Sequence, residues 1–158
     1  MTRRAFFAFH FENDLSRVDQ IRAELGAAEV HQVGFFDPAE YGALLRADKA
    51  TIRRVIRERV EGTSVTIVLI GTGTASQPFV HVAVEESIAH RNGLLGIHVH
   101  ALDDQDGQLS FAGPAPIVPA GVEFPCYTWD WDFERFAHEI ELAGKRADRW
   151  RRDLQVRS

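Results

Sequence analysis

The stretch Val65-Thr66-Ile67-Val68-Leu69-Ile70 decides the fold, and the loop Gly71-Thr72-Gly73-Thr74-Ala75-Ser76 follows it directly. Thr66 is the only polar residue in the first run, and most of its neighbours are β-branched. A short, continuously apolar run of this kind predicts a strand that is buried on both faces, as in the middle of a parallel sheet. We therefore expect residues 65–70 to form a central strand that leads into a glycine-rich turn.

Outward from this run, apolar stretches alternate with stretches whose apolar residues recur at helical spacing. Strands are expected at residues 5–9, 30–36, 65–70, 94–99 and 124–128, and helices at 14–25, 44–60, 77–92 and 131–142. Asp14 is the expected N-cap of the first helix, and a polar loop containing Gly42 is expected before the second. Such alternation predicts an α/β fold with helices on both faces of a parallel sheet. Five strands in 158 residues fit the flavodoxin-like class, with strand order 2-1-3-4-5.

The topology also predicts where a ligand would bind. Folds of this class bind ligands beyond the carboxyl ends of strands, where the strand order reverses, which here means residues 9–13 and 71–76. Gly71-x-Gly73 stands at a strand–helix junction, where a phosphate would lie. Position 76 is serine and no Lys-Ser/Thr pair follows, so neither the dinucleotide fingerprint nor a P-loop is complete. A plain tight turn and a hydroxyl-lined ligand loop both remain open.

Composition limits the class of protein. Hydrophobic residues make up 45% and charged residues 26%, which is typical of one globular domain. We find neither a signal peptide nor a membrane-spanning run, and Cys126 is the single cysteine, so we predict a cytoplasmic protein without an internal disulfide. The net charge of −5 argues against nucleic-acid binding.

The charge is uneven along the chain. Between Lys145 and Arg157 six basic residues stand against two acidic ones. We predict one domain at residues 1–144 and a basic helical tail at residues 145–158. The tail is interpreted as a solvated helix, with a surface for a partner or an acidic ligand as the alternative, because Trp150 stands in the middle of the run.

Two spaced histidines raise the question of a metal site. His98-x-His100 places both imidazoles on the same side of a strand, with Asp103 and Asp104 just beyond. A zinc site normally has three or four protein ligands, so we predict hydrogen-bonded histidines and no metal.

Four blocks of the sequence together resemble one family. Residues 6–14 are similar to the FFSFHYExD opening of the TIR-like domains of bacterial Thoeris antiphage systems, and residues 62–71 to their GxSxTVVLIG strand. Thr74 and Phe79 stand where that family has a threonine and then a tryptophan, and residues 93–107 resemble its GxxGIxIHxLKDxxG block. The similarity covers roughly residues 4–130.

This resemblance implies a TIR fold and NAD chemistry. TIR domains of this kind cleave the bond between nicotinamide and ribose, and Thoeris relatives make cyclic ADP-ribose-type signals that activate a separate effector. NAD is then a substrate, and no further cofactor is expected; self-association is a possible additional interaction. By analogy with the family, the substrate-binding residues are Phe9, His10, Phe11, Asp37, Thr72 and Thr74.

The chain departs from the family at the catalytic position. TIR NADases carry a glutamate in a W-x-x-x-E pattern on the helix after the third strand, whereas here Phe79 is followed four residues later by Ala83. Leaving of nicotinamide builds positive charge on the ribose, which a carboxylate stabilises and alanine cannot. Three explanations stay open: an introduced substitution that traps ligand, a naturally inactive member, and substitution by Glu86, one helical turn further along.

Two functions from different classes follow from these residues. The first is an NAD-processing TIR domain of an antiviral system, inactive or impaired through Ala83. The alternative is a non-enzymatic TIR adaptor or phage-infection sensor that acts by protein–protein assembly. A nucleoside deoxyribosyltransferase-like enzyme would share the topology but act on nucleosides.

Overall fold

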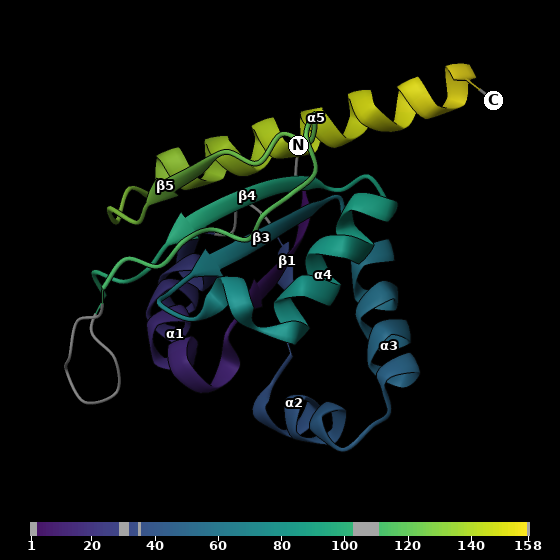
Figure 1. The fold of residues 1–158 in the computed structure, drawn as a ribbon. Coiled ribbons are helices and arrows are strands. Elements are labelled where there is room, and N and C mark those ends of the chain that lie inside the picture. The colour runs from purple at the N-terminus through teal and green to yellow at the C-terminus, as the bar shows by residue number, and fades with distance from the viewer. Residues whose placement is uncertain (1–2, 29–31, 35, 103–110, 158) are drawn as a thin grey trace.

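The computed structural model describes residues 3–28, 32–34, 36–102 and 111–157. In this part of the chain five parallel strands form one sheet of order β2-β1-β3-β4-β5. The strands are β1 (Arg4–Phe9), β2 (Gln32–Gly34), β3 (Val65–Ile70), β4 (Gly93–His98) and β5 (Cys126–Thr128). The predicted fold class and strand order are therefore confirmed, and the sheet is visible at the centre of Figure 1.

Strand β3 is central, as the apolar run predicts. It pairs with β1 on one side and β4 on the other, and all six of its residues are buried. Its one polar side chain is satisfied internally, since the Thr66 hydroxyl lies 2.6 Å from the Ser87 hydroxyl and accepts a 3.3 Å hydrogen bond from the Asn92 amide. A buried hydroxyl without such partners would destabilise the sheet.

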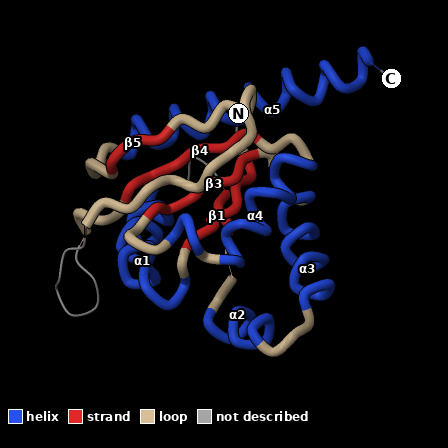
Figure 2. Tube along the Cα trace, viewed as in Figure 1, coloured by secondary structure: helices blue, strands red, loops and turns tan. Residues whose placement is uncertain are grey.

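Alternate side chains of each strand face two different helical layers. Phe7 and Ile67 belong to a buried cluster with α1 (Phe11–Ala28) and α5 (Phe133–Arg157). Phe6, Ala8 and Val68 point the other way, toward the layer formed by α2 (Pro38–Leu45), α3 (Lys49–Glu61) and α4 (Pro78–Ala89). Figure 2 shows these helices on the two sides of the strands. The period-2 alternation of a strand explains why one short sequence serves both layers.

The predicted start of the first helix is wrong. The first helix begins at Phe11 rather than Asp14, so residues 9–13 are not a loop. His10 takes the capping role, because its Nδ1 and its carbonyl oxygen both accept from the Asn13 amide, at 3.1 and 3.2 Å. A histidine acceptor at a helix start is not among the usual capping residues, which explains the error.

The predicted helix at 44–60 is in fact two helices. The expected loop around Gly42 lies inside α2, which starts at Pro38 with a capping box between Asp37 and Glu40. Asp48 caps α3 by accepting a 2.7 Å hydrogen bond from the Thr51 amide. Two aspartate N-caps eleven residues apart mark two separate helix starts.

The last helix is longer than the predicted span of 131–142. Helix α5 continues through residue 157, so the described part of the basic tail extends the same helix. Ala143 and Ala147 are fully buried at helical spacing, and Arg3 pairs with Glu141 at 3.1 Å and Asp148 at 3.0 Å. The tail is thus packed on the domain through one face. No helix in the described ranges is long and apolar enough to cross a membrane.

Candidate functional site

A cavity of about 450 Å³ lies beside the carboxyl ends of β1 and β3. Helix α1 contributes Glu12 to its wall, α2 contributes Tyr41, and α4 contributes Phe79. Most of the remaining wall is apolar. The other lining residues are Leu44, Leu45, Lys49, Ile52, Arg53, Gln77, Pro78 and Val82.

Aromatic rings build one wall of this cavity. Phe11 stacks on Tyr41 with ring centroids 4.3 Å apart, and Tyr41 meets the edge of Phe79 at 5.7 Å. Phe9 stacks behind Phe11 at 5.8 Å, and Phe36 meets Phe79 at 5.6 Å. Such pairs are worth about 0.5–1.5 kcal/mol each beyond the area they bury. The predicted residues Phe9 and Phe11 are therefore joined to the cavity through a rigid aromatic cluster.

Glu12 is the only carboxylate among the described residues that line the cavity. The Tyr41 hydroxyl donates a 3.2 Å hydrogen bond to its Oε1. Burial, followed by the nearby Glu12 charge, raises the pKa of Tyr41 to about 12. Tyr41 therefore stays a hydrogen-bond donor at neutral pH, and Glu12 is held at the cavity as an exposed carboxylate.

Ala83 lies in the core below this cavity rather than on its surface. Its exposed fraction is 0%, and it belongs to the same buried cluster as Phe6, Ala8 and Tyr41. Its carbonyl oxygen accepts a 2.6 Å hydrogen bond from the Ser87 hydroxyl. The side chain at position 83 thus has apolar surroundings, one helical turn after Phe79 and next to Val82, both of which line the cavity.

Glu86 is held elsewhere, by two arginines of α3. Its Oε1 accepts a 2.9 Å hydrogen bond from Arg53, and its Oε2 accepts a 3.0 Å hydrogen bond from Arg57. These hydrogen bonds, that from Arg57 first, lower the pKa of the carboxyl against the opposing effect of burial. The side chain is only 9% exposed, and its role in the structure is to join α3 to α4.

A second polar group lies at the ends of β1 and β3. Asp14 is fully buried and pairs with Arg17 at 2.9 Å, while Arg17 also donates to the Leu102 carbonyl at 2.8 Å. Burial raises the pKa of Asp14, and the Arg17 guanidinium opposes that shift. A Cβ on Gly71 would lie 2.3 Å from Asp14 Oδ2, so this turn requires glycine. Oδ2 has no hydrogen-bond partner among the described residues.

The other predicted binding residues have local structural tasks. Thr74 is buried, and its hydroxyl accepts a 2.7 Å hydrogen bond from the Gly71 amide, which closes the turn after β3. Thr72 is exposed and donates to the Phe111 carbonyl at 2.9 Å. His10 lies beside Gly73, where a Cβ would be 3.6 Å from its ring. Asp37 caps α2. The structure thus brings His10 to the loop that carries Thr72 and Thr74.

The two spaced histidines lie next to each other at the end of β4. The rings of His98 and His100 are 6.1 Å apart, and burial, then the neighbouring His100, lowers the pKa of His98. Within the described residues no group of three or more histidine, cysteine or acidic side chains could hold a metal ion. Asp103 and Asp104 lie outside the described residues.

Sequence reasoning missed two residues of the cavity and one buried pair. Glu12 stands in the block that carries the family resemblance, and Tyr41 stands in a segment interpreted as a loop. Asp14 and Arg17 are three residues apart on the helical face that also holds Val18 and Ile21. A charge pair on an otherwise apolar face was the available signal, because buried charges are nearly always paired.

Fold and cavity together define a class. A five-stranded parallel sheet of order 2-1-3-4-5, covered on both faces by helices and hollowed beside the ends of β1 and β3, is a flavodoxin-like α/β domain of the TIR type.

The comparison with protein families identifies the particular group. The family described as "Thoeris protein ThsB, TIR-like domain" matches residues 6–104, more than half of the chain. The chain therefore belongs to this family. It is also similar to a protein of Bacillus cereus (strain MSX-D12) named "Putative cyclic ADP-D-ribose synthase ThsB1". The two are 27% identical over 156 residues, which cover 94% of this chain and 81% of that protein.

Proposed function

We propose that this chain binds NAD⁺ in the cavity between α1, α2, α3 and α4, as the NAD-handling component of an antiviral defence system. The observation that carries the proposal is the cavity itself, lined by aromatic rings, by the Glu12 carboxylate and by the exposed Lys49. Its volume of about 450 Å³ lies within the usual range for small-molecule sites. The name of the Bacillus cereus relative supports a ligand of the NAD class.

The lining fits the parts of a dinucleotide. Tyr41 and Phe79 offer flat apolar surface to a nicotinamide or adenine ring. Lys49 is exposed at the first position of α3, where a cation and a helix N-terminus both favour a phosphate. Arg53 is already paired with Glu85 and Glu86 and is expected to contribute less.

We further propose that cleavage of the nicotinamide–ribose bond is impaired in this chain. The family resemblance puts the catalytic glutamate at position 83, and alanine supplies no charge to the developing oxocarbenium ion. Glu86 is a poor substitute because two arginines hold it toward α3. A cyclic ADP-ribose-type signal is then expected from forms of this domain that carry the carboxylate.

The test compares Ala83→Glu with Ala83→Gln, which has nearly the same size and no charge. Nicotinamide release and product chromatography are measured with NAD⁺, with and without lysate from infected cells. We expect the unchanged chain and Ala83→Gln to bind NAD⁺ without consuming it, and Ala83→Glu to release nicotinamide at least about 10²-fold faster. Thermal unfolding of all three is required, because a charge at a fully buried position costs stability.

Turnover by the unchanged chain would contradict the impairment. In that case we expect the catalytic carboxylate to be Glu12, which lines the cavity, rather than Glu86, which is paired with Arg57. Glu12→Gln would then abolish the activity, while Glu86→Gln would leave it largely intact.

A second candidate function is assembly without catalysis. Phe111 and Ile117 are 87% and 98% exposed and stand in the same segment before β5, and Leu45 is 61% exposed at the cavity rim. Exposed large apolar side chains often mark interaction surfaces. An Ala83→Glu chain that folds, binds no NAD⁺ and stays inert under every condition would favour this adaptor function, and light scattering would then measure the assembly.

A further inference from the structure

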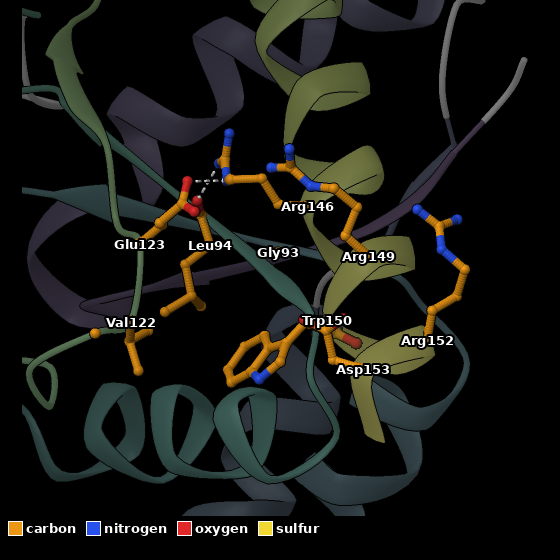
Figure 3. Close-up of a pocket in the computed structure, with 11 residues that line it drawn as sticks. Gly93, Leu94, Val122, Glu123, Arg146, Arg149, Trp150, Arg152 and Asp153 are labelled. Atoms are coloured by element: carbon orange, nitrogen blue, oxygen red, sulfur yellow. Dashed lines mark hydrogen bonds and ion pairs between the residues drawn. The ribbon is translucent and has the colours of Figure 1, made fainter. Parts of the chain in front are cut away.

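A second cavity lies at the opposite end of the parallel strands, where β4 begins. Its volume is about 540 Å³, and it is enclosed by the start of β4, the segment before β5 and the last turns of α5. We call it the basic pocket and define it by Leu94, Glu123, Arg146, Arg149, Trp150 and Arg152. Figure 3 shows Leu94, Glu123, Arg146 and Trp150 around the hollow, whereas Arg152 extends away from Trp150 on the other side of α5.

Arginines dominate the charge of the basic pocket. Arg146, Arg149 and Arg152 recur every three residues along α5, so each arginine is a neighbour of the next on the helix surface. The acidic side chains at the pocket are Glu123, which is 70% exposed, and Asp153, which is exposed. Arg149 and Arg152 are exposed as well, so solvent screens both signs of charge, and three arginines against two carboxylates leave a net charge of +1.

Arg146 is held in place without being fully satisfied. Its side chain is 14% exposed, and one terminal nitrogen donates a 2.8 Å hydrogen bond to the Leu94 carbonyl. Its buried Nε has no hydrogen-bond partner among the described residues and lies 3.8 Å from a Glu123 oxygen. Burial lowers the pKa of Arg146; the Glu123 and Glu139 carboxylates oppose that shift, and the Arg149 charge adds to it. The buried Nε thus has a carboxylate nearby but no hydrogen-bond acceptor among the described residues, and an anion in the pocket could supply one.

Trp150 adds a fixed aromatic surface. Arg91 donates a 2.7 Å hydrogen bond to the Trp150 carbonyl and places its guanidinium 5.5 Å from the ring centroid. These two contacts hold α5 and the indole against the end of α4. In Figure 3 the indole lies at the end of the hollow away from Arg146 and Glu123. The basic pocket thus offers positive charge at one end and a flat ring at the other.

We propose that the basic pocket binds a nucleotide, with its phosphates on Arg146 and Arg149 and its base against Trp150. Guanidinium groups bind phosphate oxygens through charge-assisted hydrogen bonds, and indole rings stack on nucleobases. The pocket volume suits a ligand of mononucleotide size. Most of the lining lies in residues 121–153, beyond the segment 6–104 that matches the family. The proposal does not depend on NAD⁺ binding in the other cavity.

The test is a calorimetric titration of the full chain with ADP, pyrophosphate and adenosine at an ionic strength of about 0.15 M. Arg149→Gln removes an exposed guanidinium and leaves the anchored Arg146 in place. Arg22→Gln is the matched control, an arginine on α1 that pairs with Asp19. We expect ADP to bind the unchanged chain, Arg149→Gln to weaken it about tenfold, and Arg22→Gln to leave it unchanged.

The aromatic part of the proposal has its own variant. Trp150→Leu keeps an apolar side chain and removes the ring. We expect it to reduce ADP affinity while pyrophosphate affinity stays the same, with folding checked by circular dichroism. Equal affinity of the unchanged chain for ADP and pyrophosphate would overturn the nucleotide assignment. Pyrophosphate can bind the arginines as ADP does, but it has no base to stack on the Trp150 ring.

A second site for ADP must be separated from the first. Val82→Trp fills the other cavity, since Val82 lines it. ADP binding that survives Val82→Trp and weakens in Arg149→Gln supports the basic pocket. Binding that is lost in Val82→Trp and unaffected by Arg149→Gln overturns the proposal, as does the absence of saturable ADP binding at about 1 mM ligand. NAD⁺ titrations of the same two variants report on the other cavity separately.

Discussion

The two cavities of this domain lie at opposite ends of the parallel strands and differ in the chemistry of their lining. The cavity beside the ends of β1 and β3 is lined mainly by aromatic and aliphatic side chains, with Glu12 at its wall. The basic pocket at the start of β4 is lined by three arginines of α5 and by Trp150. The first thus offers apolar and aromatic surface, and the second offers a net positive charge.

The difference follows from which helices form each wall. The apolar cavity lies among four helices, and α2, α3 and α4 belong to one buried cluster that also contains Phe6 and Ala8. The basic pocket depends on one helix, α5, laid across the start of β4. A cavity enclosed by several packed elements keeps its shape more readily than one closed by a single helix. Changes in the packing of α5 are therefore expected to affect the basic pocket more than the apolar cavity.

Deletion of residues 145–158 is expected to have the largest effect. It removes the fully buried Ala147, the 3.0 Å pair from Arg3 to Asp148, and the 2.7 Å hydrogen bond from Arg151 to Asn92. We expect the free energy of unfolding to fall by more than about 4 kcal/mol, measured by urea denaturation.

The control for this deletion keeps the helix and removes charge. The double variant Arg149→Gln, Arg152→Gln retains Ala147 and Asp148 and should stay within about 0.5 kcal/mol of the unchanged chain. A deletion as mild as that control would mean that the tail is only a solvated helix and that the basic pocket has no stable wall.

Gly93→Ala tests the packing of α5 on β4 by adding a single carbon atom at their contact. A Cβ at position 93 would lie 1.9 Å from the Ala143 carbonyl oxygen, so α5 must move away from β4. We expect a loss of about 2–3 kcal/mol in unfolding free energy, and weaker ADP binding with it. Gly42→Ala is the control, because its Cβ would approach nothing closer than 3.9 Å and it lies inside α2, where alanine is preferred.

The expected gain for Gly42→Ala is about 0.5–1 kcal/mol. If both variants changed stability by the same amount and in the same direction, close contact between α5 and β4 would not be what position 93 requires. Thermal unfolding of the two variants measured side by side decides this.

The sequence predicts the sheet better than the helices around it. The run at 65–70 needs only its own composition to indicate a buried central strand, and the alternation of runs indicates a parallel sheet. The strand order 2-1-3-4-5 followed from the fold class rather than from particular residues. The start of α1 at Phe11 depends on a histidine cap, and the packing of residues 145–153 depends on partners such as Arg3, far away in the sequence. Contacts of that kind have no local signature.

The same limit applies to the candidate site. None of the six predicted substrate-binding residues lines the cavity, although Phe9 and Phe11 stack behind Tyr41, which does, because the end of β1 lies at the switch point of the topology. Glu12 and Tyr41 meet only because α1 and α2 converge, 29 residues apart in the chain. Thr74 has the residue type of a ligand-binding hydroxyl, yet the turn after β3 uses it internally.

Glu86→Gln is expected to have the smallest effect, and it tests whether this carboxylate is structural. The substitution weakens the link between α3 and α4, two helices that contribute to the apolar cavity, and should cost about 1 kcal/mol at neutral pH. The folded pKa lies below the ordinary value of 4.5, so the stabilisation is present above that pH and is lost as the pH falls through the folded pKa. Urea denaturation of the unchanged chain and of Glu86→Gln should therefore give a difference in unfolding free energy that is constant above about pH 5 and shrinks in acid.

Glu85→Gln is the matched control, since Glu85 also pairs with Arg53 but is 61% exposed, and it should change stability by less than about 0.5 kcal/mol. A difference for Glu86→Gln that does not depend on pH would mean that the Glu86 charge is not what links α3 to α4. If Glu86→Gln, made in the Ala83→Glu chain, abolished nicotinamide release without loss of stability, Glu86 would belong to the reacting site.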